Sequence, residues 1–123
     1  NYVSSTVGQG THMNNFLAVA LGGAIGAMGR YGAGIALVRS PSFALWLPLG
    51  TLSVNVVGSM LIGLVWVYLQ QRNESEFIRL FVAVGLLGGF TTFSTFSLET
   101  VFMIAEGQWW RAVINIVLNV VSC

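Results

Sequence analysis

The residues best suited to chemistry lie in one stretch, from Gly85 to Thr100, which reads GLLGGFTTFSTFSLET. Although it belongs to a long apolar segment, this stretch contains six hydroxyl side chains, two adjacent glycines and a glutamate. Phenylalanine recurs at every third position, as Phe90, Phe93 and Phe96. Aromatic ring edges carry partial positive charge, and hydroxyl groups donate hydrogen bonds. The stretch therefore combines two kinds of group that can face an anion without holding it too tightly.

A second polar feature centres on Asn55, in the apolar segment that precedes this stretch. Thr51, Asn55, Ser59 and Gly63 follow at a spacing of four, so a helix would place them on one stripe. Two interpretations are open. The stripe can join helices through hydrogen bonds worth about 1 kcal/mol or less in a bilayer. Alternatively, it can line a polar pathway in which Asn55 donates its amide hydrogens to an anion.

Arg30 and Glu99 are the ionisable residues that lie well inside apolar segments. Buried charge is unfavourable in a bilayer and usually marks a pathway or an ion pair. The two residues can pair with each other, or Arg30 can extend its guanidinium toward the membrane surface. The sequence leaves both arrangements open.

The composition indicates an integral membrane protein. Of the 123 residues, 55% are hydrophobic and only 7% are charged, whereas a soluble domain carries about 25% charged residues. A net charge of +1 argues against a nucleic-acid partner. The single cysteine, Cys123, excludes an internal disulfide and a multi-cysteine metal site. No nucleophile–base pair or metal-ligand cluster suggests an enzyme.

Four transmembrane helices are expected, which makes the fold all-α. The first three run over residues 15–38, 51–70 and 77–104, and a fourth follows Trp109 and Trp110. Residues 1–13 are polar and resemble a tag or linker remnant, so we treat them as a leader and residues 14–123 as the membrane domain. The fourth helix is expected to be truncated, because a span needs about 20 residues.

The third segment is too long for one straight span. Its 28 residues would form a helix of about 42 Å, against a hydrocarbon core of about 30 Å. We expect a break near Gly88-Gly89. Non-helical backbone at this depth persists only where it is buried in protein or faces a wet cavity, and the carbonyls it exposes favour a cation.

Charge placement predicts no preferred orientation in the membrane. Arg72 and Arg79 lie on one side, and Arg39 and Arg111 lie on the other, so the positive-inside rule gives almost no bias. If chains of both orientations pair, the product is an antiparallel dimer in the bilayer. Small residues at a spacing of four in the first segment predict close helix packing, within the chain or with a second copy.

The motif GGFTTFSTFSLET closely resembles the signature of the Fluc-type fluoride channels, the CrcB family. GGAIGAMGRYG and PLGTLSVNVVGSMLIG precede it in the expected order. The resemblance implies a dual-topology homodimer in the bacterial inner membrane. Its two pores would passively export fluoride from the cytoplasm and so confer fluoride resistance.

By motif position, Phe93 and Phe96 match the pore-facing phenylalanines of the family, and Asn55 matches its pore-lining asparagine. Ser94 and Thr95 match the hydroxyl groups that hydrogen-bond the ion. The backbone carbonyls of Gly88 and Thr91 match the ligands of one structural sodium ion at the dimer centre. Four further residues are candidates for vestibule or structural roles: Arg30, Glu99, Asn119 and Ser122.

The main alternative is a small multidrug transporter, which is also a short dual-topology dimer. That class needs an acidic residue near the middle of its first helix to exchange protons for cationic drugs. The first segment here has only Arg30 as a charged residue. A non-transporting membrane assembly subunit is a third interpretation.

Overall fold

The computed structural model describes residues 2–38 and 47–123, and the regular secondary structure within these ranges is helical. The elements are α1 (Tyr2–Val38), α3 (Leu49–Gln71), α4 (Glu76–Arg79), the π-helix η1 (Leu80–Leu87), α5 (Gly88–Phe90), α6 (Phe93–Ala105) and α7 (Trp109–Ser122). Three stretches are long and apolar enough to cross a membrane: His12–Leu37, Leu49–Gln71 and Glu76–Ala105. Helix α7 is apolar but shorter. The expected all-α fold with membrane-spanning helices is confirmed.

The helix bounds agree with the sequence for the second and third segments and differ for the first. Helix α1 begins at Tyr2, so it includes residues 2–13, which the sequence assigns to a leader. The described part of α1 extends to Val38. Arg39, which enters the charge count used for orientation, lies outside the described residues.

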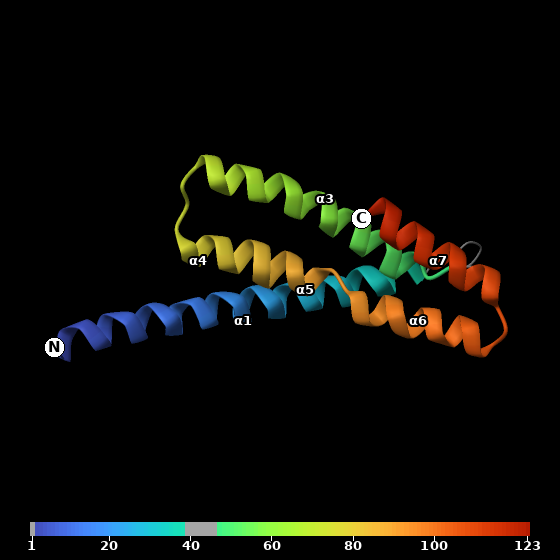
Figure 1. Ribbon diagram of the computed structural model, residues 1–123, viewed down its shortest axis with the longest axis horizontal. Coiled ribbons are helices and arrows are strands. Elements are labelled where there is room, and N and C mark those ends of the chain that lie inside the picture. The colour runs from blue at the N-terminus through green and yellow to red at the C-terminus, as the bar shows by residue number, and fades with distance from the viewer. Residues whose placement is uncertain (1, 39–46) are drawn as a thin grey trace.

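Helix α1 lies directly against η1 and α5 (Figure 1). Glycines make this approach possible, because a Cβ atom at Gly22 or Gly26 would overlap the backbone carbonyl oxygens of Phe81 or Leu86. A Cβ at Gly89 would lie 2.7 Å from the carbonyl oxygen of Gly23. The small-residue pattern of the first segment therefore serves packing within the chain at these positions.

The break in the third segment is present, but it lies at Thr91 and Thr92 and not at the glycine pair. Gly88 is helical, with φ −64° and ψ −37°. Thr91 (φ −78°, ψ 157°) and Thr92 (φ −150°, ψ 115°) are extended. The extended residues thus lie just after the predicted glycine pair, and Gly89 itself serves the close approach to α1. The hydroxyl of Thr92 begins the next helix by accepting a hydrogen bond from the Thr95 N–H at 3.2 Å.

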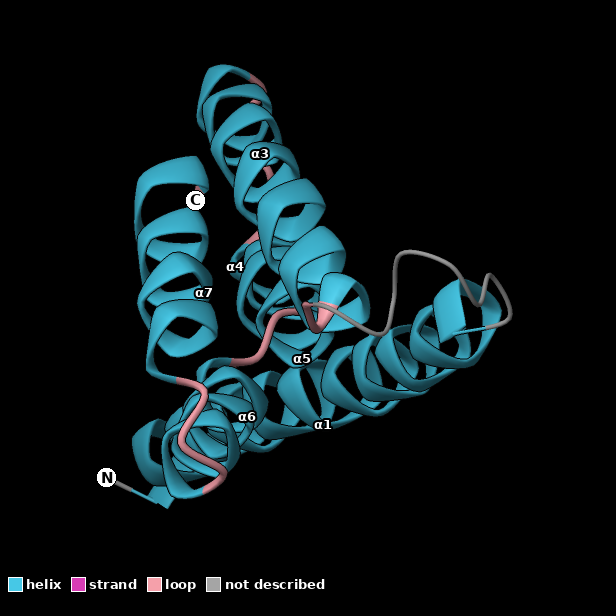
Figure 2. Cartoon of the chain, turned by 90° about the vertical axis from the view of Figure 1, so that its right-hand side faces the viewer, coloured by secondary structure: helices cyan, strands magenta, loops and turns pink. Residues whose placement is uncertain are grey.

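Helix α7 returns from the end of α6 and packs against both α6 and α3 (Figure 2). Most large apolar side chains of the described residues face outward, among them Phe16, Leu64, Phe102 and Trp110. A water-soluble monomer rarely exposes so much contiguous apolar surface. Lipid or a second copy must therefore cover these faces, while a few polar side chains occupy the interior.

Candidate functional site

The helix break is held in place by the side chain of Asn55 from α3. Its Oδ1 accepts a hydrogen bond from the Thr92 N–H at 2.7 Å, and its Nδ2 donates to the Thr92 carbonyl at 3.0 Å. These two bonds satisfy both backbone polar groups of Thr92, which the break removes from the helical pattern. Asn55 is buried. The sequence predicts it as a site residue, and the structure places it at the break itself.

The same amide continues into a chain of buried polar side chains on α7. Asn55 Nδ2 also donates to Asn119 Oδ1 at 3.0 Å. Asn119 Nδ2 donates to Asn115 Oδ1 at 3.0 Å, and Asn115 Nδ2 donates to Thr100 Oγ1 at 3.0 Å. Asn115 is 1% exposed, the lowest value among the large side chains described. We call Asn55, Asn119, Asn115 and Thr100 the amide chain.

A groove of about 320 Å³ opens beside the first two members of the amide chain. It is lined by residues of α3, the break, α6 and α7: Asn55, Ser59, Thr91, Thr92, Phe93, Phe96, Asn119, Val120 and Cys123. The rings of Phe93 and Phe96 are 5.3 Å apart between centroids and inclined by 58°. Phe96 is 7% exposed and Phe93 is 77% exposed. The groove thus brings together both predicted phenylalanines and Asn55.

The predicted hydroxyl residues are divided between two places. Thr92 Oγ1 contacts Ser94 Oγ at 3.2 Å and donates to Thr95 Oγ1 at 3.0 Å. Ser94 is exposed and does not line the groove, and Thr95 lines a second cavity. Ser122 is also exposed and lies outside the groove. The structure therefore does not bring Ser94, Thr95 and Ser122 to the phenylalanine pair.

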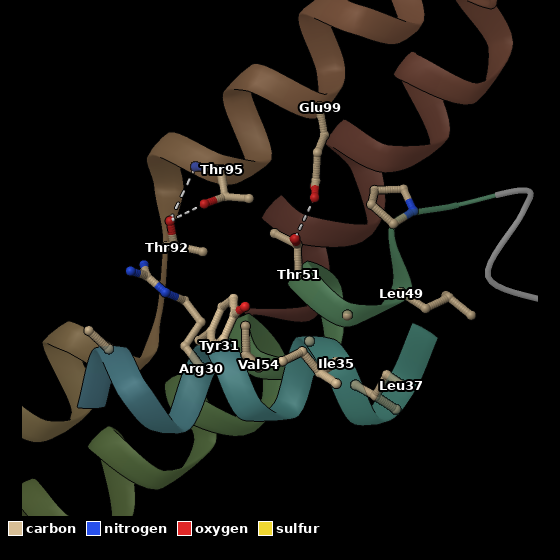
Figure 3. Close-up of a pocket in the computed structure, with 14 residues that line it drawn as sticks. Arg30, Tyr31, Ile35, Leu37, Leu49, Thr51, Val54, Thr92, Thr95 and Glu99 are labelled. Atoms are coloured by element: carbon tan, nitrogen blue, oxygen red, sulfur yellow. Dashed lines mark hydrogen bonds between the residues drawn. The ribbon is translucent and has the colours of Figure 1, made fainter. Parts of the chain in front are cut away.

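The second cavity, of about 770 Å³, is lined by both Arg30 and Glu99, which are half-buried (Figure 3). Glu99 points toward Thr51, whose hydroxyl donates to Glu99 Oε1 at 2.7 Å. Arg30 enters from α1 and donates to the Thr91 carbonyl at 3.4 Å. Of the two interpretations for these residues, direct pairing is not observed: they share the cavity and bond different partners. Glu99 Oε2 is buried, and the described residues offer it no hydrogen-bond partner.

The break also changes the surroundings of two predicted carbonyl ligands. The usual donor to the Gly88 carbonyl would be the Thr92 N–H, which here donates to Asn55. The Thr91 carbonyl faces the Arg30 guanidinium. Gly88 is exposed on the surface of the chain. Among the described residues, no group of three or more His, Cys, Asp or Glu side chains could hold a metal ion.

Two members of the amide chain were not predicted as site residues, namely Thr100 and Asn115. The signal was present, since Asn115 and Asn119 are four residues apart and share one face of a helix. Their partner on α6 could not be identified without knowing how α6 and α7 pack. Chemically, the site places amide and hydroxyl groups beside aromatic rings in an apolar protein, an arrangement suited to a small anion.

Comparison with known proteins gives concordant matches. A model of the family described as CrcB-like protein, Camphor Resistance (CrcB), matches residues 17–123. The "Fluoride-specific ion channel FluC" of Shewanella sp. strain ANA-3 is 47% identical over 111 residues, which cover 90% of this chain and 88% of the relative. The proteins of the same name from Shewanella baltica strain OS185 and Shewanella oneidensis strain MR-1 are 46% and 47% identical, with the same coverage.

Proposed function

The chain belongs to the CrcB-like family, and from this premise we propose that it is a membrane channel that conducts fluoride and is not an enzyme. The relatives named above are fluoride-specific channels and match this chain over nearly its whole length. The structural observation that carries the proposal is the groove at the helix break, where the Asn55 amide lies beside the rings of Phe93 and Phe96. A small multidrug transporter is not supported, because the only charged residue within the first span is Arg30.

Conduction by this site is passive. Fluoride is small and strongly hydrated, so a narrow pathway must replace its water with other donors. The groove is lined by the Asn55 amide and by two aromatic rings, whose edges carry partial positive charge. Ring edges are weak ligands, so the ion can be both bound and released. A negative interior would drive fluoride out of a bacterial cell through its inner membrane, which would confer fluoride resistance.

We propose that the working channel is an antiparallel homodimer. One chain exposes its groove and the Phe93 ring, and a bilayer would not favour an open groove lined by amides and hydroxyls. A second copy in inverted orientation would cover it and generate two equivalent pathways. Reporter fusions to the C-terminus test the orientation: activity of both a cytoplasmic and a periplasmic reporter is expected, and activity of only one would contradict dual topology.

A sodium ion at the dimer centre would be held by the carbonyls of Gly88 and Thr91 from both copies. The exposed position of Gly88 and the loss of its usual helical donor support this assignment. The Arg30 guanidinium would have to move away from the Thr91 carbonyl, because it occupies the position of a competing cation. The ion would supply positive charge that holds the two helix breaks together, with no part in a reaction.

The function is tested by efflux from liposomes that contain the purified chain and either fluoride or chloride. Rapid release of fluoride, measured with an ion-selective electrode after a potassium ionophore is added, is expected while chloride is retained. Fluoride release no faster than from protein-free liposomes would refute the proposal. Proton-coupled uptake of a cationic dye would favour the transporter instead.

A further inference from the structure

The hydrogen bonds of the amide chain all run in one direction. The series ends at the Phe96 carbonyl, which accepts from the Thr100 hydroxyl at 2.8 Å. Because that hydroxyl proton is committed, Thr100 Oγ1 can only accept from Asn115, which turns the Asn115 NH₂ toward α6. Asn115 Oδ1 then accepts from Asn119, and Asn119 Oδ1 must face Asn55. The backbone of α6 thus sets the orientation of Asn115, and Asn119 is oriented by its bonds to both the side chain and the backbone carbonyl of Asn115.

Both amide hydrogens of Asn55 are therefore engaged within the protein. One is donated to the Thr92 carbonyl and the other to Asn119 Oδ1, each at 3.0 Å. An amide has only two such hydrogens. Asn55 can consequently donate to a passing ion only after it releases one of its present acceptors.

The bond to Asn119 is the one that can exchange. The bonds between Asn55 and Thr92 form a closed pair, in which loss of one would leave a backbone group of the break unsatisfied. Asn119, in contrast, belongs to α7 and lines the groove where an ion would arrive. An anion can replace its neutral carbonyl oxygen as the acceptor, since charged acceptors form the stronger hydrogen bonds.

We propose that Asn119 is an internal acceptor that fluoride displaces from the Asn55 amide, and that Asn115 and Thr100 are positioning residues that determine how strongly Asn119 competes. This inference rests on the proposed function. It also explains why a helix in an apolar bundle contains a fully buried asparagine. A polar side chain at Asn115 is unfavourable unless it is hydrogen-bonded, and its bonds direct the Asn119 carbonyl toward the pathway.

The inference predicts a specific kinetic change. Single-channel current recorded over a range of fluoride concentrations gives a half-saturating concentration that does not depend on the number of active channels. Asn119→Leu removes the competing acceptor, so the half-saturating fluoride concentration should fall roughly twofold to tenfold, the equivalent of one hydrogen bond. Thr100→Val frees Asn115 to reorient. This variant should also lower the half-saturating fluoride concentration, but by less than Asn119→Leu.

Two matched variants separate positioning from general damage. Thr100→Ser keeps the hydroxyl and should restore the parental half-saturation, and Val121→Ala alters an exposed α7 residue outside the groove. An unchanged or raised half-saturating concentration in both Asn119→Leu and Thr100→Val would overturn the inference. Loss of all current in both would also overturn it, because removal of a competitor should not abolish conduction. If the unmodified chain carries no fluoride current, it is the proposed function that fails.

Discussion

Replacing Asn55 with aspartate tests the site with a minimal change of shape. The Oδ1 atom can still accept from the Thr92 N–H, so the break keeps one of its two bonds to this side chain. The second oxygen takes the place of Nδ2 and faces two other oxygens, the Thr92 carbonyl and Asn119 Oδ1, each 3.0 Å from the present nitrogen. Two hydrogen bonds therefore become repulsive contacts, and a negative charge is added to the groove.

The charge should dominate the effect on fluoride flux. At a separation of about 4 Å and an effective dielectric constant of about 20, two like charges repel by about 4 kcal/mol. A barrier raised by that amount slows passage roughly a thousandfold. Liposome efflux of fluoride measures the change, and size-exclusion chromatography shows whether the protein remains assembled. Ser53→Asp is the matched control, because it adds the same charge to the same helix outside the groove.

The reasoning would be refuted if Asn55→Asp released fluoride as fast as Ser53→Asp. If the two variants release fluoride at equal rates and both remain assembled, Asn55 does not lie on the fluoride pathway. If both variants failed to assemble, the magnitude would be taken from Asn55→Ser. Asn55→Ser adds no charge and should reduce fluoride flux far less than a thousandfold. A thousandfold loss of flux in this uncharged variant would show that charge is not the cause.

Three further outcomes are expected. Gly26→Ala forces a Cβ into the backbone of η1 and should lower the free energy of unfolding in mixed micelles by about 2 kcal/mol. Gly32→Ala, whose added Cβ enters open space, should not lower the free energy of unfolding. Equal stability of the two variants would contradict the close packing of α1 against η1. Phe96→Ile should greatly reduce fluoride efflux, while Phe102→Ile, at an exposed position outside the groove, should not; equal efflux rates of the two variants would exclude a role for the Phe96 ring. A bulky thiol reagent should block flux by modifying Cys123, which lines the groove, and continued flux after complete modification would place the path elsewhere.

The helices could be predicted from the sequence because their signal is local. Long apolar runs interrupted by short polar turns define α3 and the segment that contains η1, α5 and α6 within one or two residues. The position of the break could not be predicted in the same way. Glycines are the usual local sign of an interrupted helix, but Gly89 is used for contact with α1. The break depends on Asn55, a residue 37 positions from Thr92 in the chain.

The residues that line the groove could be predicted where an unusual side chain marks them, and the members of the amide chain were missed where their contacts depend on packing. Asn55, Phe93 and Phe96 stand out as an amide and two aromatics in unusual surroundings, and the groove brings them together. Asn115 lies four residues before Asn119, but this spacing alone does not separate it from a helix-joining asparagine. Its role follows only from the contact with Thr100, which the turn between α6 and α7 creates.

The central claim, that this chain conducts fluoride selectively, is tested most directly by the reversal potential of its current in a planar bilayer. Fluoride on one side and chloride on the other, at equal concentrations and with a common cation, give the two anions opposite driving forces. We predict a large reversal potential of the sign that fluoride permeation requires. A reversal potential near zero, or one of the opposite sign, would contradict the account.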